Sequence, residues 1–317
     1  MFCGLPLAWL WFVLINDLRV EWTVNPQYSY GWIVPFLCVF LLWRSATSTA
    51  ESRKSDSGFR FQHFSLHHLP SSIFYLLFAL LALLYLPTRL IEVANPDWRL
   101  VSWALALEVI GITLCVLRAA CSSPAGAGED VHRTGEGSLF QVSSLKFQFS
   151  DFIFPFLFFL VSVPWPTLIE SPLIQALTRM DVGATCELAG WFGIPAIPHG
   201  NVIEVAGGQV GIDEACSGIR SFQATLMISL FLGEFYRLRI WRRAFCVGTG
   251  FALALLLNLI RQLVLVWVAA TKGVPAIAQW HDPTGVIILL GCFMSLWLIG
   301  QWLAERKQGT TRPRTKG

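Results

Sequence analysis

The chain alternates long apolar runs with shorter polar segments. Eight runs are long enough, or nearly so, to cross a bilayer, whose hydrocarbon core of about 30 Å needs roughly 20 apolar residues in a helix. They occupy about residues 4–16, 31–44, 72–87, 100–120, 151–169, 216–236, 244–271 and 284–303. The first two are short. The pattern predicts an all-α polytopic membrane protein with about eight transmembrane helices.

The longest polar interruption, residues 170–215, has a pattern of its own. Its first half places apolar residues at helical spacing and opens with Ser171 and Pro172, an N-cap followed by a proline at the first helical position. The later sequence NVIEVAGGQVGID alternates polar and apolar residues around Gly207 and Gly208, which predicts a β-hairpin. We expect a small amphipathic helix and hairpin, which either rest on the membrane surface or cover the outer mouth of the bundle.

Basic residues indicate the orientation, because short loops rich in Lys and Arg stay in the cytoplasm. The sequence RLRIWRR contains four arginines, and the C-terminal tail is also basic. Alternation then gives the cytoplasmic segments as 45–71, 121–150, 237–243 and the tail 304–317. Segment 170–215 falls outside and both termini fall inside. Residues 1–317 are therefore expected to form a single membrane-embedded domain, with 170–215 as an extracytoplasmic insertion.

The composition agrees with a membrane protein. Of the 317 residues, 55% are hydrophobic and only 14% are charged, whereas soluble domains carry about 25% charged residues. A disordered chain would be far less apolar. The net charge of +3 is too small to suggest nucleic acid as a partner. The eight cysteines include no CxxC pair and no cluster with zinc spacing, so neither a disulfide scaffold nor a metal or other cofactor is expected.

The seventh apolar run contains polar residues that are candidates for function, because an unpaired ionisable group inside a bilayer costs several kcal/mol. Asn258, Arg261 and Gln262 share one face of the expected helix. Arg261 lies about 15 Å below the outer helix end, and its long side chain can reach toward the outer interface. Two interpretations follow. Either the arginine bonds backbone carbonyls of neighbouring helices, or it binds an anion.

The sequence IDEACSGIRSF before the sixth run makes Cys216 a candidate nucleophile. Asp213 is suited to cap a helix whose third residue is Cys216, where the helix dipole and Arg220 favour the thiolate. The acids Asp213 and Glu214 oppose this effect. An inert small residue, or a disulfide with Cys186, is equally compatible with these residues.

His281 lies in an expected outside loop before the last apolar run and is the third candidate catalytic residue, with Cys216 and Arg261. The predicted topology brings it to the same face as Cys216, with Arg261 beneath them. A cysteine that attacks, a histidine that moves the proton and an arginine that balances an oxyanion together suit acyl transfer. Competing chemistries lack their motifs, since the chain has no HExxH, no GxSxG and no Walker glycine loop.

Four stretches of the chain resemble the exosortase/archaeosortase family of multi-pass membrane proteins. In order they are NPQYSYGWIVPFLCVFLLWR, DEACSGIRS, NLIRQL and the histidine of QWHDPTGV. The resemblance implies a cysteine protease or transpeptidase at the outer face of the bacterial cytoplasmic (inner) membrane. It implies a catalytic trio of Cys216, Arg261 and His281, with Arg220 and Asn258 as supporting, substrate-binding positions.

The resemblance also implies the partners. Substrates would be exported proteins that end in a PEP-CTERM-type motif, a transmembrane helix and a basic cluster. A thioester on Cys216 would be resolved by water or by an acceptor amine or hydroxyl, without metal or nucleotide. A non-enzymatic alternative is a membrane transporter or an assembly factor for envelope polysaccharide, in which Arg261 binds an anionic head group. Such a protein would tolerate the loss of Cys216. The sequence does not indicate an oligomeric state.

Overall fold

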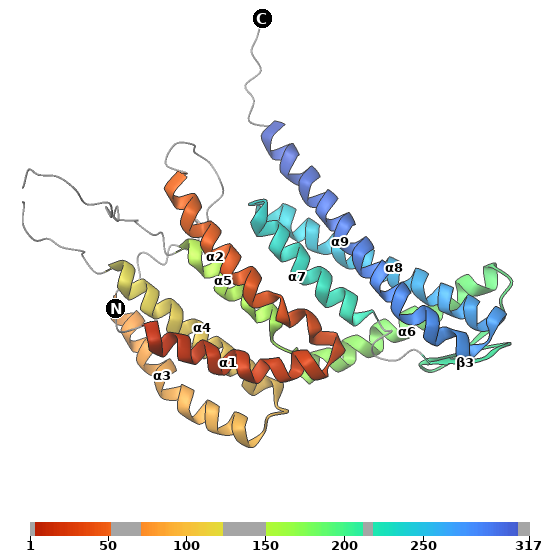
Figure 1. Ribbon diagram of the computed structural model, residues 1–317, viewed down its shortest axis with the longest axis horizontal. Coiled ribbons are helices and arrows are strands. Elements are labelled where there is room, and N and C mark those ends of the chain that lie inside the picture. Colours follow the sequence, from red (N-terminus) through yellow and green to blue (C-terminus); the bar gives the residue numbers. More distant parts are fainter. Residues whose placement is uncertain (1–3, 52–70, 123–149, 212–217, 310–317) are drawn as a thin grey trace, which may run out of the picture. The chain divides into compact units, whose positions relative to one another are not determined.

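The computed structural model describes residues 4–51, 71–122, 150–211 and 218–309 of the chain. These residues are mostly helical, with one small sheet (Figure 1). The helical elements are α1 (Gly4–Val24), η1 (Pro26–Trp32), α2 (Val34–Glu51), α3 (Ser71–Ala94), α4 (Arg99–Ser122), α5 (Ser150–Phe158), η4 (Phe159–Ser162), α6 (Thr167–Trp191), α7 (Ile219–Phe235), α8 (Ile240–Lys272), η6 (Val274–Ala276) and α9 (Ile277–Gly309).

Several helices are long and apolar enough to cross a membrane, which fits a multi-pass membrane protein. Within the described residues, the five candidate spans are Pro26–Thr47, Ser72–Ala94, Arg99–Ala120, Ile240–Lys272 and Val274–Arg306. A sixth results if the bent pair formed by Phe152–Ser162 and Thr167–Trp191 is counted as one span. The expected count of eight spans is therefore not confirmed.

Two of the expected spans fall short for local reasons. The second half of α1 contains Asp17, Arg19 and Glu21, so this helix has no long uncharged stretch. Helix α7 has only 17 residues. At 1.5 Å per residue its length is about 26 Å, less than the thickness of a bilayer core.

Helix α6 begins earlier than the sequence predicts. The expected N-cap Ser171 and first helical residue Pro172 both lie inside the helix, which starts at Thr167. A break at residues 163–166 separates the helical segment Phe152–Ser162 from α6. Pro164 and Pro166 cause the break, because proline removes a helical hydrogen bond and restricts the residue before it. The expected fifth span thus becomes two helices.

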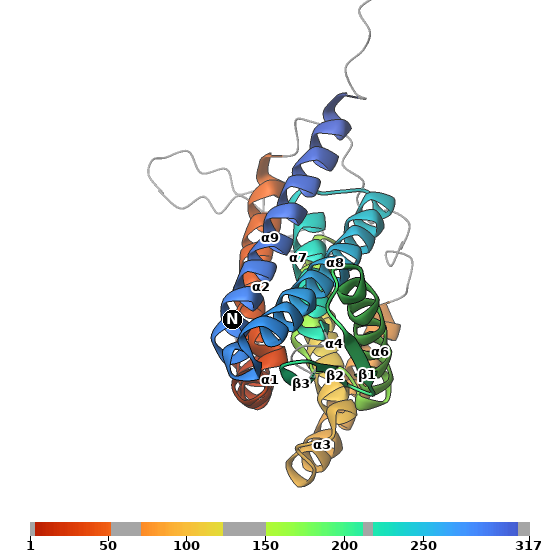
Figure 2. The ribbon, with the colours of Figure 1, turned by 90° about the vertical axis from the view of Figure 1, so that its right-hand side faces the viewer.

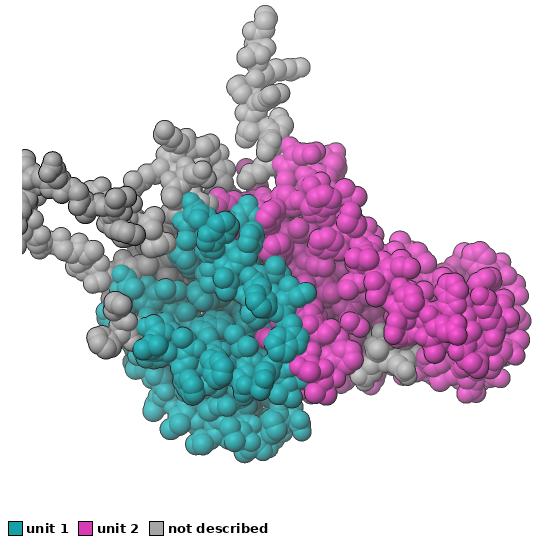
Figure 3. Space-filling view, in the orientation of Figure 1, with its two compact units in different colours: residues 1–20, 32–164 teal, residues 21–31, 165–317 magenta. Residues whose placement is uncertain are grey.

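The chain divides into two compact units (Figure 3). Unit 1 contains residues 1–20 and 32–164, and unit 2 contains residues 21–31 and 165–317. All candidate site residues lie in the sequence of unit 2. The single membrane-embedded domain expected from the sequence stays a prediction.

Unit 1 contains a cluster of charged side chains among its apolar helices. Arg89 of α3 forms ion pairs with Asp17 of α1 and with Glu92, one turn further along α3. Elsewhere in this unit, the indole Nε1 of Trp11 donates a hydrogen bond of 3.0 Å to Thr113 Oγ1. These partners compensate the cost of placing polar groups in an apolar setting.

Unit 2 contains the sheet, which is antiparallel with the order β1 (Ala196–His199), β2 (Val202–Val205) and β3 (Gly208–Gly211). The expected hairpin corresponds to β2 and β3, and the structure adds β1. The turn needs glycine twice. Gly208 has a positive φ of 125°, and a Cβ on Gly207 would lie 2.1 Å from the carbonyl oxygen of Ala269.

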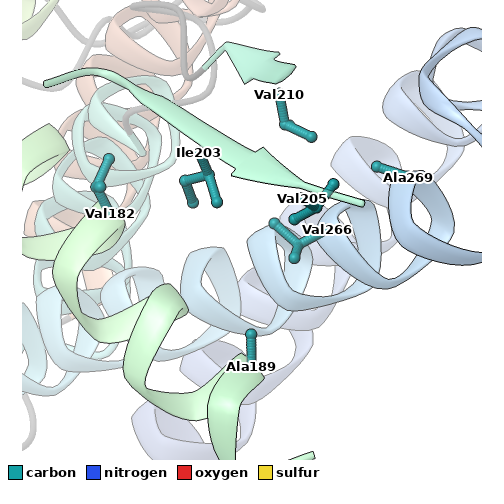
Figure 4. Close-up of a cluster of buried hydrophobic side chains, with 7 residues drawn as sticks. All are labelled: Val182, Ala189, Ile203, Val205, Val210, Val266 and Ala269. Carbon is teal, nitrogen blue, oxygen red and sulfur yellow. The ribbon is translucent and has the colours of Figure 1, made fainter. Parts of the chain in front are cut away.

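A buried apolar cluster joins the sheet to α6 and α8. Figure 2 shows the strands beside these two helices. Its residues, drawn in Figure 4, are Val182, Ala189, Ile203, Val205, Val210, Val266 and Ala269. The sheet therefore packs on the C-terminal part of α8, the part that follows Arg261.

Candidate functional site

The start of α7 packs closely against α8. Gly218 is the N-cap of α7 and has a positive φ of 79°, a conformation that favours glycine. A Cβ at this position would lie 2.9 Å from Nδ2 of Asn258. The sequence predicts that this helix begins directly after Asp213, but it begins at Ile219. Asp213 and Cys216 lie outside the described residues, so the placement of Cys216 stays a prediction.

The three polar residues of α8 lie on its buried face, as expected. Asn258 and Gln262 are each 1% exposed, and Arg261 is 8% exposed. Nδ2 of Asn258 donates a hydrogen bond of 2.6 Å to Oδ2 of Asp181, which lies on α6 and is also buried. The amide group therefore connects α6 to α8 next to the start of α7.

Arg261 and His281 lie side by side. Nη2 of Arg261 is 3.0 Å from Nε2 of His281 and donates a second hydrogen bond of 3.3 Å to the His281 carbonyl oxygen. Nε of Arg261 is buried and has no hydrogen-bond partner within the described part of the chain. His281 lies in the second turn of α9 rather than in the expected loop, because the helix begins at Ile277.

Two further charged residues are close to this pair. Nδ1 of His281 is 2.9 Å from Oδ1 of Asp282. Arg261 and Arg220 both act electrostatically on the Asp282 carboxylate. Arg220 is exposed near the start of α7, where its Nη2 lies 3.4 Å from Ser29 Oγ. Helices α7, α8 and α9 thus each contribute a charged or titratable side chain to one region.

The NPQYSYGW stretch forms η1 and is held by a buried network. The Tyr28 hydroxyl and the Gln27 amide both donate hydrogen bonds to the carboxylate of Glu170, in the first turn of α6. The hydroxyl also accepts a hydrogen bond of 2.9 Å from the backbone N–H of Trp165. This network fixes η1, including Ser29, against the beginning of α6.

Glu170, Asp181 and Asp282 are not among the site residues predicted from the sequence. Glu170 and Asp181 share the buried face of α6 with Ile174, Leu177, Thr178, Val182, Thr185 and Ala189. An acid at helical spacing among apolar residues is the signal that could have indicated both, since a buried carboxylate needs a partner. Asp282 gives no such signal, because its contact with His281 depends on how the histidine ring is turned.

The described residues also bear on the role of Cys186 and on metal binding. Cys186, half-buried on α6, is a free thiol and packs against the cluster of Figure 4. The other cysteine of the disulfide alternative, Cys216, lies outside the described residues. Among the described residues, no group of three or more His, Cys, Asp or Glu side chains could hold a metal ion.

Comparison with known proteins identifies the family. Residues 22–298 match the family model of the transmembrane exosortases, from the end of α1 to the middle of α9. No curated protein and no solved structure matches the chain. The matched segment contains the helices that supply Arg220, Asn258, Arg261 and His281, and it also contains Cys216. Because this match extends over most of its length, the chain belongs to the transmembrane exosortase family.

Proposed function

We propose that this exosortase is a membrane cysteine protease or transpeptidase. It cleaves the C-terminal sorting signal of exported proteins at the outer face of the bacterial cytoplasmic membrane. The observation that carries the proposal is the contact of 3.0 Å between the Arg261 guanidinium and the His281 imidazole. Such a pair supplies a group that binds developing negative charge and a group that moves protons, as acyl transfer requires.

The environment of Arg261 favours an anion-binding role over helix packing alone. Its bond to the His281 carbonyl is what a packing role requires. However, the same guanidinium also faces a titratable ring, and its buried Nε has no partner among the described residues. A planar guanidinium with a spare donor can hold an oxyanion and a backbone carbonyl together.

Chain connectivity limits how far Cys216 can lie from the start of α7. Cys216 is joined to Gly218 by two peptide units, which span at most about 7.6 Å between Cα atoms. Gly218 contacts Asn258, which precedes Arg261 by one turn of α8. The Asn258 amide is already bonded to Asp181, so we assign Asn258 to holding the start of α7 and Arg220 to binding substrate.

The reaction follows from these roles. His281 takes the thiol proton of Cys216, and the resulting thiolate adds to the scissile carbonyl carbon while Arg261 binds the oxyanion. Collapse of this intermediate breaks the C–N bond while His281 gives a proton to the leaving amine. The remaining thioester is attacked by water or by an acceptor amine or hydroxyl, which releases the product and returns the cysteine.

The orientation is part of the proposal. If the arginine-rich segment 237–243 is cytoplasmic, Arg261 lies 18 residues beyond Arg243, or about 27 Å along α8. This places Arg261 close to the outer interface of a bilayer core about 30 Å thick. Reporter fusions after residue 243 should report the inside, and fusions near residues 195 and 278 should report the outside.

The experiment uses a tagged exported protein with a PEP-CTERM-type C-terminus, expressed together with the full-length enzyme. Cys216→Ala should abolish processing while the amount of inserted enzyme stays normal. The matched control, Cys186→Ser, should process normally because Cys186 only packs against the sheet. A hydroxylamine-sensitive adduct should form on the wild type and on Cys186→Ser but not on Cys216→Ala. Continued processing by Cys216→Ala would instead favour a non-enzymatic transporter or assembly factor.

A further inference from the structure

We propose that Asp282 is a positioning residue that holds His281 in the tautomer protonated at Nδ1, so that the Nε2 lone pair faces Arg261. The proposal rests on the proposed function, because it concerns the proton-transfer group of that reaction. It assigns a third member to the Arg261–His281 pair, outside the trio that the family resemblance implies.

Two neighbours of the His281 ring favour the same tautomer. A guanidinium has only donors, so Nε2 of His281 must be the acceptor in its 3.0 Å contact with Arg261. A neutral imidazole then carries its single proton on Nδ1. That nitrogen lies 2.9 Å from Oδ1 of Asp282, which can only accept when ionised. Both contacts therefore favour the tautomer that carries its proton on Nδ1.

The contact between these two residues is not a consequence of helical spacing. His281 and Asp282 are consecutive in α9, and side chains one residue apart on a helix do not ordinarily face each other. Here the imidazole is turned so that one nitrogen meets the neighbouring carboxylate and the other meets α8. The ring is consequently held at both ends.

The charge of Asp282 matters because its surroundings are cationic. Arg261 on α8 and Arg220 on α7 both act on this carboxylate. Lys272, at the end of α8, lies instead over the Trp280 ring at 5.1 Å. A guanidinium beside Nε2 opposes the uptake of a proton there. The carboxylate at Nδ1 offsets that repulsion and stabilises the imidazolium that forms during catalysis.

The test compares Asp282→Ala and Asp282→Glu in the full-length enzyme. The Asp282 side chain is 91% exposed, so neither change should disturb folding. Asp282→Ala should lower kcat by about 10-fold or more and leave KM nearly unchanged. This is less than the roughly 10⁴-fold loss known for a buried triad aspartate, because water can replace part of an exposed carboxylate. Asp282→Glu should retain most of the wild-type kcat.

Glu204→Gln is the matched control, since it removes the carboxylate of a second histidine pair, His199–Glu204 at 2.9 Å, on the exposed sheet. Its kcat should equal that of the wild type.

Nitrogen NMR of ¹⁵N-histidine-labelled full-length protein tests the tautomer without any turnover. The His281 signal, assigned by its loss in His281→Gln, should show protonation at Nδ1 in the wild type and a gain of the Nε2–H form in Asp282→Ala. Protonation at Nε2 in the wild type, or an unchanged kcat in Asp282→Ala, would overturn the proposal. If the wild type shows no processing that depends on Cys216, the proposed function fails, and the NMR result still decides the role of Asp282.

Discussion

Arg89 and Arg261 both lie within apolar helices of this protein, and their surroundings differ. Arg89, in unit 1, pairs with the two carboxylates of Asp17 and Glu92. Arg261, in unit 2, contacts the ring and the carbonyl of His281 and makes no ion pair with any described residue. The Arg89 side chain is also the more accessible of the two, at 28% exposed, whereas Arg261 as a residue is 8% exposed.

Under the proposed function, the comparison separates a structural arginine from a functional one. The charge of Arg89 is more than balanced by its two acids, so this cluster can stabilise the packing of α1 on α3. Arg261 is more deeply buried and less compensated, which costs stability. The proposed function accounts for this cost, because it assigns an oxyanion to Arg261. Substitutions around Arg89 should therefore change the free energy of unfolding, and substitutions around Arg261 should change turnover.

The largest effect is expected from removing the partner of Arg261. His281→Ala should lower processing per folded molecule by about 10²–10⁴-fold, because the leaving amine then lacks a proton donor. The inserted amount should stay near normal, since the histidine is partly exposed. Processing of the tagged substrate, divided by the amount of folded enzyme, measures this. The control His199→Ala should process normally, and an equal loss in that variant would remove the distinction between the two histidines.

A smaller effect, on stability instead of turnover, is expected from removing a partner of Arg89. Asp17→Asn should lower the free energy of unfolding by about 1–3 kcal/mol, because a charge-assisted hydrogen bond is lost. Turnover per folded molecule should stay within about twofold. Thermal unfolding in detergent, followed with the processing assay, checks both values. A large loss of turnover at unchanged stability would contradict the structural role of this cluster.

The smallest effect is expected at Asp181, which connects to the site only through Asn258. Asp181→Asn keeps the shape and an acceptor for the Asn258 amide, and should cost less than about 1 kcal/mol. Asp181→Ala removes the acceptor and should cost roughly 1–3 kcal/mol. Its turnover should fall by less than tenfold, because the start of α7 loosens without losing a reacting group. An identical unfolding temperature in wild type and Asp181→Ala would show that the hydrogen bond from Asn258 to Asp181 does not stabilise the fold.

Local patterns predicted the features that depend on local physics. The polar face of α8 follows from helical periodicity, and the β2–β3 hairpin follows from alternation around Gly207 and Gly208. The span count was less predictable, because α1 remains helical although charged residues interrupt it, and because Pro164 and Pro166 divide the fifth run.

The rest of the site depends on contacts between distant helices. The bond from Asn258 to Asp181 joins residues 77 positions apart, and the network of Tyr28 and Glu170 joins residues 142 positions apart. No periodicity in a single sequence specifies such pairs. The approach of Arg261 to His281 could be anticipated, because the predicted topology placed both residues toward one face.

The most direct test of the central claim exchanges each arginine for lysine. Lysine keeps the positive charge and loses the planar pair of donors. We predict that Arg89→Lys stays folded and processes normally, because its carboxylates require mainly a charge. We predict that Arg261→Lys also stays folded but loses about 10²-fold or more of its processing per folded molecule, as expected when an oxyanion donor is misplaced. Near-normal processing by Arg261→Lys would contradict the claim and leave Arg261 as a residue that only packs helices together.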